Sequence, residues 1–297
     1  MTEWPLISLV TPSFNQGQFL EATLQSVLSQ GYPRLEYVVV DGGSTDGSVD
    51  ILRRYAPHLT SWVSEPDEGQ TDALVKGFAR CSGVVMNWLN SDDLLRPGAL
   101  FAVARAYMQG GPDLIAGRCR DFRDDPEQPV GHFIPTGHTF PECLRFWDGS
   151  YRYHQPCTFF SRSAYERAGG LDRGLHYLMD YDFYCRVLAL PGARVREIDD
   201  ELSAFRLHPD AKTSRAKDGF LREQRAVSRR YWPRAWGEHE QRAMDRFSAE
   251  STLFHASAAL REHAWARALR AVGSSLRFAP WHALRFALRR AAIRGSS

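Results

Sequence analysis

Two adjacent carboxylates, Asp92 and Asp93, interrupt an apolar stretch of the chain. Residues 84–89 are apolar apart from Asn87, with β-branched and aromatic side chains that predict a buried strand, and Pro97 is typical of a first helical turn. The two acids would then lie at the C-terminal end of a core strand, where open α/β sheets bind ligands. A divalent cation would relieve their repulsion, because hard cations bind through carboxylates and substrate phosphates. A plain helix N-cap is the alternative interpretation, since Asp is a common cap.

Acidic side chains also stand at other predicted element ends. Asp41 follows an apolar run at 35–40 and opens a glycine-rich turn at 41–48, and Asp72 lies just inside a predicted helix. Turns and caps explain each acid taken alone, but acids on strand ends that face one crevice indicate a ligand site. No GxGxxG follows the first predicted strand and no GxxxxGK[ST] occurs, so the usual dinucleotide and P-loop signals are missing.

The first part of the chain alternates between strand and helix patterns. The segments at 6–10, 35–40, 61–64 and 84–89 predict strands, of which that at 61–64 is short. The spacing of Leu20, Leu24 and Val27 predicts a helix between the first two. This alternation over about the first 115 residues is typical of βαβ units and of a mostly parallel sheet flanked by helices. The fold class is therefore α/β.

The later part of the chain is less regular. Residues 121–150 are rich in Asp, Pro, Gly and aromatic side chains, which predicts a mobile loop region. Further predicted elements are strands at 113–116, 158–160 and 195–198 and helices at 97–108, 163–168, 180–188, 217–231, 238–271 and 280–294.

The composition is close to that of an average soluble globular protein. The 297 residues are 43% hydrophobic and 24% charged, and a net charge of +2 carries no nucleic-acid signature. Five scattered Cys without a CxxC pair argue against a disulfide framework or a zinc site, and for a reducing compartment. The first residues show no signal-peptide pattern, and no uncharged apolar run approaches the ~20 residues of a membrane span. We therefore expect a cytoplasmic protein, with peripheral contact at the inner membrane face left open.

Three segments together resemble family 2 glycosyltransferases of the GT-A fold. They are Ile-Ser-Leu-Val-Thr-Pro-Ser-Phe-Asn at 7–15, Val-Val-Asp-Gly-Gly-Ser-Thr-Asp-Gly-Ser at 39–48 and Trp-Leu-Asn-Ser-Asp-Asp at 88–93. No single motif is specific, but the combination and its spacing are. The resemblance covers roughly residues 5–212 and leaves 216–297 outside.

The resemblance implies a nucleobase pocket at the first two strand ends. Asp41 would hydrogen-bond the base, and Thr11, Pro12 and Phe14 would line the same pocket. The family often carries a second acid where this chain has Gly42.

It also implies a metal and diphosphate site. Asp72 would face the nucleotide, Asp92 would contact the ribose or sugar, and Asp93 would hold Mn2+ or Mg2+. Ser91 stands where the first acid of a DxD motif usually stands, so Asp92 would share the role.

A catalytic base is implied in the second half of the fold. Met179-Asp180-Tyr181-Asp182 resembles a Glu-Asp-x-Asp stretch, with Met179 in place of the Glu. Asp180 then matches the base of the inverting enzymes, which takes the proton of an acceptor hydroxyl as it attacks the sugar. Asp182 is expected to cap or support the helix.

Two further segments match the family on the diphosphate or acceptor side. Arg206-Leu207-His208 resembles the stretch that closes the domain, so His208 would meet the metal or the diphosphate, with Arg206 beside it. His154 matches a stretch near the acceptor. A lone His is otherwise more often a structural residue.

The basic tail has two interpretations. From Arg261 to the end there are eight Arg and one Glu. The tail helices would pack on the catalytic domain, as apolar faces usually do, or lie on an anionic membrane with aromatic side chains at headgroup level.

We thus expect a GT-A domain at 1–215 and a basic α-helical C-terminal extension at 216–297. The domain would comprise a nucleotide-sugar-binding half, 1–117, and an acceptor-binding half, 118–215. The predicted function is the inverting, metal-assisted transfer of a sugar from a nucleotide-diphosphate sugar to a saccharide or lipid-linked acceptor. A UDP-sugar is the donor expected first, and surface polysaccharide or glycolipid synthesis is the expected process. A nucleotidyltransferase and a non-catalytic sugar-nucleotide-binding module are the alternatives. No nucleic-acid partner is expected.

Overall fold

The structure is a computed structural model that describes residues 3–137, 139–145, 153–212 and 217–231, with scattered positions between 238 and 280. The chain divides into two compact units. Unit 1 comprises Met1–Cys143 with Tyr151–Ser214, and unit 2 comprises Leu144–Ser150 with Arg215–Ser297. The expected boundary between the GT-A domain and the C-terminal extension, at 215/216, stays a prediction. The same holds for the expected boundary between the two halves of the domain, at 117/118.

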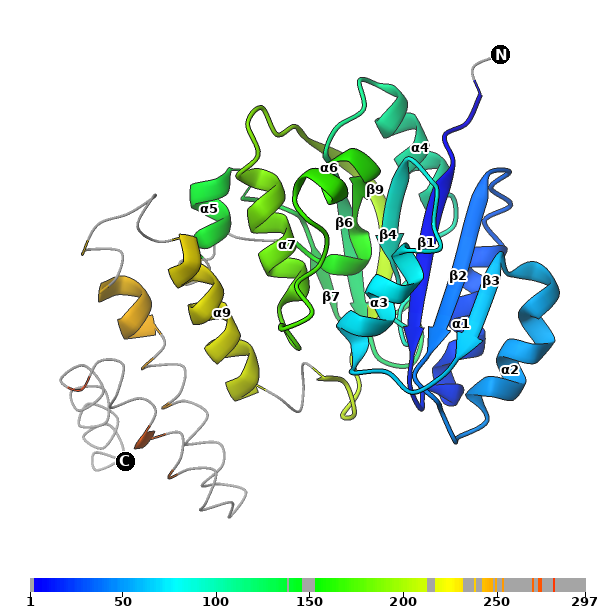
Figure 1. Cartoon of the computed structure of the whole chain (residues 1–297), viewed down its shortest axis with the longest axis horizontal. Helices are drawn as coiled ribbons and strands as arrows, with labels where there is room; N and C mark the ends of the chain where they lie inside the picture. The colour runs from blue at the N-terminus through cyan, green and yellow to red at the C-terminus, as the bar shows by residue number, and fades with distance from the viewer. Residues whose placement is uncertain are drawn as a thin grey trace. The chain divides into compact units, whose positions relative to one another are not determined.

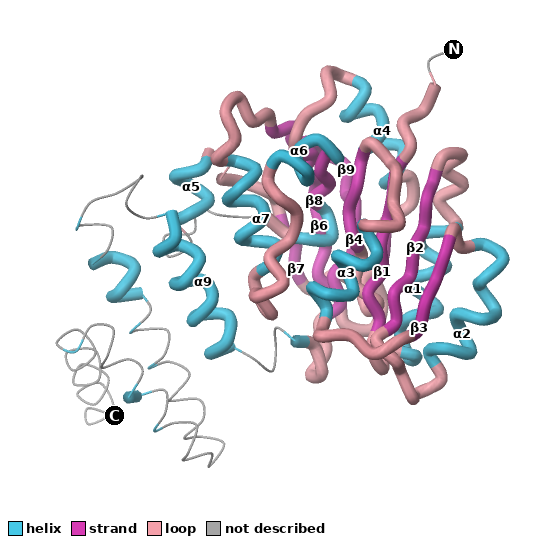
Figure 2. The backbone as a smooth tube through the Cα atoms, viewed as in Figure 1, coloured by secondary structure: helices cyan, strands magenta, loops and turns pink. Residues whose placement is uncertain are grey.

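Unit 1 is built on a nine-stranded mixed sheet (Figures 1 and 2). The strand order is β3-β2-β1-β4-β8-β6-β9-β5, and β7 pairs with β6. The pairs β1–β2, β1–β4, β2–β3 and β6–β9 are parallel, whereas β4–β8, β5–β9, β6–β7 and β6–β8 are antiparallel. The strands are β1 (Ile7–Ser13), β2 (Leu35–Asp41), β3 (Ser61–Ser64), β4 (Val85–Trp88), β5 (Leu94–Leu95), β6 (Leu114–Phe122), β7 (Gly131–Phe133), β8 (Thr158–Ser161) and β9 (Val195–Arg206).

Helices cover both faces of this sheet. In Figure 1, α3, α6 and α7 lie in front of the sheet and α1 lies behind it. The helices assigned before residue 215 are α1 (Gly17–Leu28), α2 (Ser48–Tyr55), α3 (Gln70–Phe78), α4 (Ala99–Met108), α5 (Phe140–Leu144), α6 (Arg162–Arg167) and α7 (Met179–Leu188), with 3-10 turns η1 (Ala56–His58) and η2 (Gln155–Cys157). The helix α9 (Lys217–Tyr231) belongs to unit 2.

Apolar periodicity explains how the first half forms. Every residue of β1 is buried, as expected of a strand covered on both faces, and Leu20, Leu24 and Val27 of α1 point into the same core. The absence of a side chain at Gly77 lets α3 approach β1 closely, because a Cβ there would lie 2.4 Å from Cγ1 of Val10. These contacts fix the strand ends that carry the polar residues.

The α/β fold and the elements of the first half are confirmed. The region 121–150, predicted as loop, also contains β7 and α5. The strand predicted at 195–198 extends to Arg206 as β9, which pairs with β6 through register shifts. The helix at 217–231 is confirmed as α9, whereas the helices predicted at 238–271 and 280–294 lie largely outside the described residues. In the described part of the chain, no helix is both long enough and apolar enough to span a membrane.

Candidate active site

The loops after β1 and β2 are joined into one rim. Asn15 has a positive φ of 51°, its Oδ1 accepts the N–H of Thr45 at 2.9 Å, and its own N–H donates to Oγ of Ser44 at 2.8 Å. The N–H of Gly17 donates to Oδ2 of Asp46 at 2.8 Å. These hydrogen bonds fix the positions of the two strand ends relative to each other. A ligand site formed by both loops requires such a fixed arrangement.

Asp41 is buried at the centre of its own turn. Its carboxylate accepts the N–H groups of Gly43 and Ser44 at 3.1 and 2.9 Å. It also accepts the hydroxyls of Ser44 and Ser64 at 2.5 and 2.7 Å. These four hydrogen bonds equal about the four that an ionised carboxylate can accept. The acid thus shapes the turn and joins it to β3.

The other residues predicted for the base pocket differ in exposure. Thr11 is buried with its hydroxyl 3.0 Å from that of Tyr37, and Pro12 is buried in the same strand. Phe14 is 60% exposed at the end of β1. Of these residues, Phe14 presents the largest surface to a ligand.

Asp92 and His208 face each other at the end of β4. Oδ2 of Asp92 lies 3.0 Å from Nε2 of His208. Their side chains are 19% and 9% exposed, and the His208 ring packs against Phe19 with centroids 4.7 Å apart. A carboxylate oxygen and an imidazole nitrogen, separated by 116 residues in the chain, thus meet at a partly exposed point.

Asp93 has a different environment from its neighbour. It is 0% exposed, its Oδ1 accepts the N–H of Arg206 at 3.0 Å, and its Oδ2 accepts from Nδ2 of Asn90 at 3.3 Å. Burial, and then the charge of Asp92, raises the pKa of Asp93 well above its usual range. The carboxyl predicted to hold the metal therefore points into the protein.

Arg206 fixes the backbone of the acidic pair. Its guanidinium lies 4.5 and 4.8 Å from the ring centroids of Phe122 and Phe19. Its Nε donates to the carbonyl of Asp92 at 3.0 Å. In this position Arg206 supports the loop at 90–93.

A chain of polar contacts links the end of β4 to the segment before α7. Nε2 of Gln70 donates to Oδ1 of Asn90 at 2.7 Å, and Nζ of Lys212 donates to Oε1 of Gln70 at 3.1 Å. The same ammonium donates to the carbonyl of His176. Thr71 in α3 donates to the carbonyl of Leu175 at 2.7 Å. The sequence patterns did not single out Gln70, Thr71 or Lys212, because their partners are distant in the chain.

Asp72 lies in the first turn of α3 among basic side chains. Its Oδ2 is 3.1 Å from Nζ of Lys76, and its Oδ1 is 3.6 Å from Arg173. Although desolvation opposes it, hydrogen bonding to Lys76 and to the N–H of Glu68 lowers the pKa of Asp72. Asp72 is therefore a paired, ionised group beside the polar contacts just described.

The two acids of α7 have different surroundings. Asp180 is partly exposed in the first turn, and its Oδ1 accepts the N–H of Tyr181 at 2.8 Å. Asp182 is buried, and its Oδ2 lies 2.8 Å from both Nε and Nη2 of Arg186. This contact matches the supporting role expected of Asp182 and leaves Asp180 as the accessible acid.

His154 lies between aromatic rings. Its ring centroid is 4.9 Å from that of Phe133 and 4.7 Å from that of Phe205. Burial lowers the pKa of His154 to about 4, so the ring is neutral near pH 7. The side chain next to it, Gln155, donates to the carbonyl of Trp88 at 2.5 Å and so holds η2 against β4.

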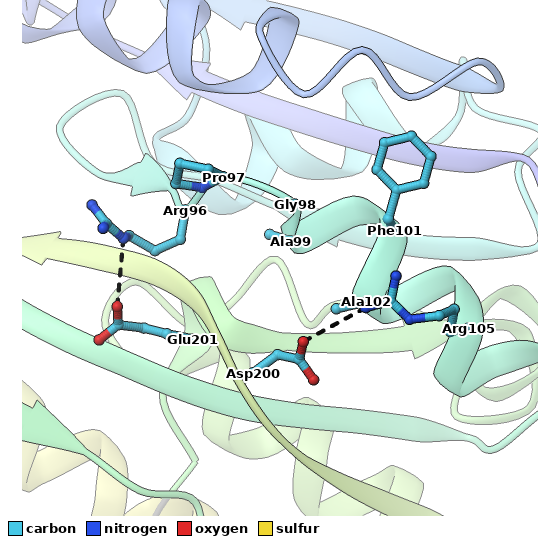
Figure 3. Close-up of a pocket in the computed structure, with 9 residues that line it drawn as sticks. All are labelled: Arg96, Pro97, Gly98, Ala99, Phe101, Ala102, Arg105, Asp200 and Glu201. Carbon is cyan, nitrogen blue, oxygen red and sulfur yellow. Dashed lines mark ion pairs between the residues drawn. The ribbon is translucent and has the colours of Figure 1, made fainter.

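A separate cavity of about 640 Å³ lies at the start of α4 (Figure 3). Its charged side chains are paired, Arg96 with Glu201 at 3.5 Å and Arg105 with Asp200 at 3.7 Å. The acids of the 90–93 loop and of α7 do not line it. Among the residues that the structure describes, no cluster of three or more His, Cys, Asp or Glu is placed to hold a metal ion.

Comparison with known proteins identifies the family. The model described as "Glycosyl transferase family 2" matches residues 8–169. The chain belongs to glycosyl transferase family 2. This family 2 enzyme is 32% identical over 188 residues to an uncharacterised glycosyltransferase of Mycobacterium tuberculosis, covering 63% of this chain and 70% of that protein. It is 25% identical over 185 residues to the chondroitin synthase of Escherichia coli, covering 62% of this chain and 26% of that enzyme.

Solved structures show that the family 2 chain has a GT-A-type fold. S. aureus TarS 1–349 in complex with UDP matches with a TM-score of 0.61 at 17% identity, over 82% of this chain and 70% of that chain. The mannosyltransferase PcManGT of Pyrobaculum calidifontis in complex with GDP-Man and Mn2+ matches with a TM-score of 0.57 at 20% identity, over 100% and 77%. The family match and the named relatives confirm the predicted enzyme class, glycosyltransferase.

Proposed function

We propose that this glycosyltransferase moves a sugar, with inversion, from a nucleotide-diphosphate sugar to an acceptor hydroxyl with the help of Mn2+ or Mg2+. The observation that carries the proposal is the pair formed by Asp92 and His208, 3.0 Å apart at the end of β4. Structures of TarS with UDP and of PcManGT with GDP-Man and Mn2+ support a nucleotide donor and a metal. A UDP-sugar is the first candidate.

Asp92 and His208 are the residues that would hold the metal. The sequence interpretation gave this role to Asp93 and His208, with Asp92 sharing it. The buried carboxyl of Asp93, however, already accepts from Arg206 and Asn90. The carboxylate, diphosphate oxygens and water suit Mn2+ or Mg2+, and the imidazole favours the transition metal, Mn2+, of the two. When bound, the cation offsets the charge that develops on the departing diphosphate. Asp93 then acts as a positioning residue for the loop.

Asp180 is the proposed general base. It is partly exposed, and the N–H of Tyr181 holds one of its oxygens in place. It would take the proton from the acceptor hydroxyl as that oxygen attacks the sugar. A single in-line displacement inverts the sugar carbon and needs no covalent enzyme intermediate. Asp182 is unsuited to this role because its carboxylate is buried against Arg186.

A named relative supports a role in surface polysaccharide or glycolipid synthesis. The chondroitin synthase among its relatives makes a saccharide or lipid-linked acceptor the first choice.

The five cysteines are free thiols, which supports a reducing, cytoplasmic location. The basic residues 216–297 remain the candidate contact with an anionic membrane surface.

A donor panel tests the proposal. The full chain is incubated with UDP-, GDP- and dTDP-sugars, with and without Mn2+, and binding is followed by thermal shift. Acceptor-dependent release of a nucleoside diphosphate is then measured with each donor that binds. Metal-dependent stabilisation and diphosphate release support the proposal. Release of pyrophosphate from a nucleoside triphosphate and a sugar 1-phosphate, in a parallel assay, would instead identify a nucleotidyltransferase. No binding of any donor would overturn the proposal.

A further inference from the structure

A side chain from the loop after β3 leaves no room for a side chain at position 42. Its φ lies outside the left-handed region, so its backbone conformation is open to any L-residue. A Cβ at this position would lie 2.7 Å from Oδ2 of Asp67 and 3.1 Å from its Cγ. The carboxylate of Asp67 therefore occupies the space into which a side chain at position 42 would extend.

The neighbouring acid, Asp41, has little capacity left for a ligand. It is fully buried, and Gly43, Ser44 and Ser64 supply the four hydrogen bonds described above. A base that hydrogen-bonded Asp41 would have to displace one of these donors. Two acids, Asp41 and Asp67, therefore lie at this end of β2. Only Asp41 uses its oxygens to hold the turn together.

Asp67 has one anchored oxygen and one that faces Gly42. The loop after β3 starts with the N–H of Glu65 donating to the carbonyl of Asp41 at 3.0 Å, which brings it across the end of β2. Oδ1 of Asp67 accepts the N–H of Gly69 at 2.8 Å. Within the described residues, Oδ2 has no hydrogen-bond donor, and the side chain is only partly buried. This leaves a fixed, charged acceptor directed across the end of β2.

We propose that Asp67, and not Asp41, reads the nucleobase of the donor. An anionic acceptor pairs with a ring N–H that lies between carbonyl groups or beside an amino group. Uracil N3–H and guanine N1–H offer such a donor, whereas cytosine N3 and adenine N1 are acceptors. Asp67 would thus select UDP- and GDP-sugars over CDP- and ADP-sugars. The inference rests on the proposed function, because it assigns a residue to the donor site of that reaction.

Asp67→Asn gives a directional test. The N–H of Gly69 holds the Asn oxygen, so the amide nitrogen takes the place of Oδ2 and presents a donor. A donor opposes uracil N3–H and suits cytosine N3. Dissociation constants for UDP, GDP, CDP and ADP are measured by calorimetry with Mn2+ for the full chain, Asp67→Asn and the exposed control Glu68→Gln.

We expect the wild type and Glu68→Gln to bind UDP or GDP at least about tenfold more tightly than CDP, the scale of one hydrogen bond to a charged group. In Asp67→Asn this preference should fall about tenfold or more. The double variant Gly42→Asp/Asp67→Gly, which moves the acid to the other strand end, should restore it. Equal weakening of all four nucleotides, or an unchanged preference, would overturn the inference and leave the proposed function standing. No nucleotide binding by the wild type would overturn both.

Discussion

Replacing Asp182 by Asn should lower the stability of the fold while leaving turnover intact. The carboxylate is 1% exposed and lies 2.8 Å from two nitrogens of Arg186, whose side chain is 21% exposed. Breaking a buried ion pair by removing one partner costs roughly 3–5 kcal/mol. Asn keeps one acceptor oxygen, and Arg186 keeps its bond to the carbonyl of Ala168 and some hydration. We therefore expect a loss of about 2–4 kcal/mol.

Urea unfolding at pH 7 measures this change, read as a lower midpoint with an unchanged slope. Asp199→Asn is the matched control, because Asp199 pairs with Arg118 on the surface at 2.7 Å. That pair should contribute less than about 1 kcal/mol. A double-mutant cycle with Arg186→Met should show strong coupling for Asp182. A loss no larger than that of Asp199→Asn would refute the structural role of the pair.

Three further predictions follow from single contacts. The lowered pKa of His154, about 4 when folded against an ordinary value near 6.5, means that the unfolded chain binds the proton first as pH falls. Stability is then lost between these pH values, and His154→Asn should reduce the loss between pH 7 and 5 by about 2 kcal/mol in urea unfolding. Asp92→Asn should abolish Mn2+-dependent UDP binding in calorimetry, whereas Asp93→Asn should largely retain it. Loss of binding in Asp93→Asn, with binding retained in Asp92→Asn, would show that Asp93 is the metal ligand. Gly77→Ala places a Cβ 2.4 Å from Val10 and should cost about 1–3 kcal/mol in thermal unfolding, whereas wild-type stability would show that α3 can move away.

Local patterns were sufficient for most of unit 1. The strands near residues 7, 35 and 85 are rich in buried apolar side chains, and Leu20, Leu24 and Val27 mark one face of α1. Such periodicity is a property of a few adjacent residues, so a single sequence carries it. Short or irregular elements such as β5 and β7 depend on a distant partner strand and left no local pattern.

The roles of neighbouring acids could not be assigned in the same way. Asp92 and Asp93 are adjacent in sequence, yet one faces His208 and the other accepts from the N–H of Arg206. These partners lie 116 and 113 residues away, so only the folded chain decides which carboxylate is accessible. The contact between Gly42 and Asp67 also depends on the tertiary fold. The carboxylate of Asp67, from the loop after β3, occupies the space that a side chain at position 42 would fill.

The measurement that tests the central claim most directly is the turnover of Asp180→Asn with the preferred donor and a competent acceptor. A general base acts as the acceptor proton leaves, so its loss should lower kcat roughly a hundredfold or more. Asn nearly preserves the shape of the side chain, so the dissociation constant of the donor and the urea midpoint should stay close to those of the wild type. Asp182→Asn, assayed well below its unfolding midpoint, should keep a kcat within about twofold of the wild type. A silent Asp180→Asn beside a folded but inactive Asp182→Asn would contradict the account and move the base to Asp182.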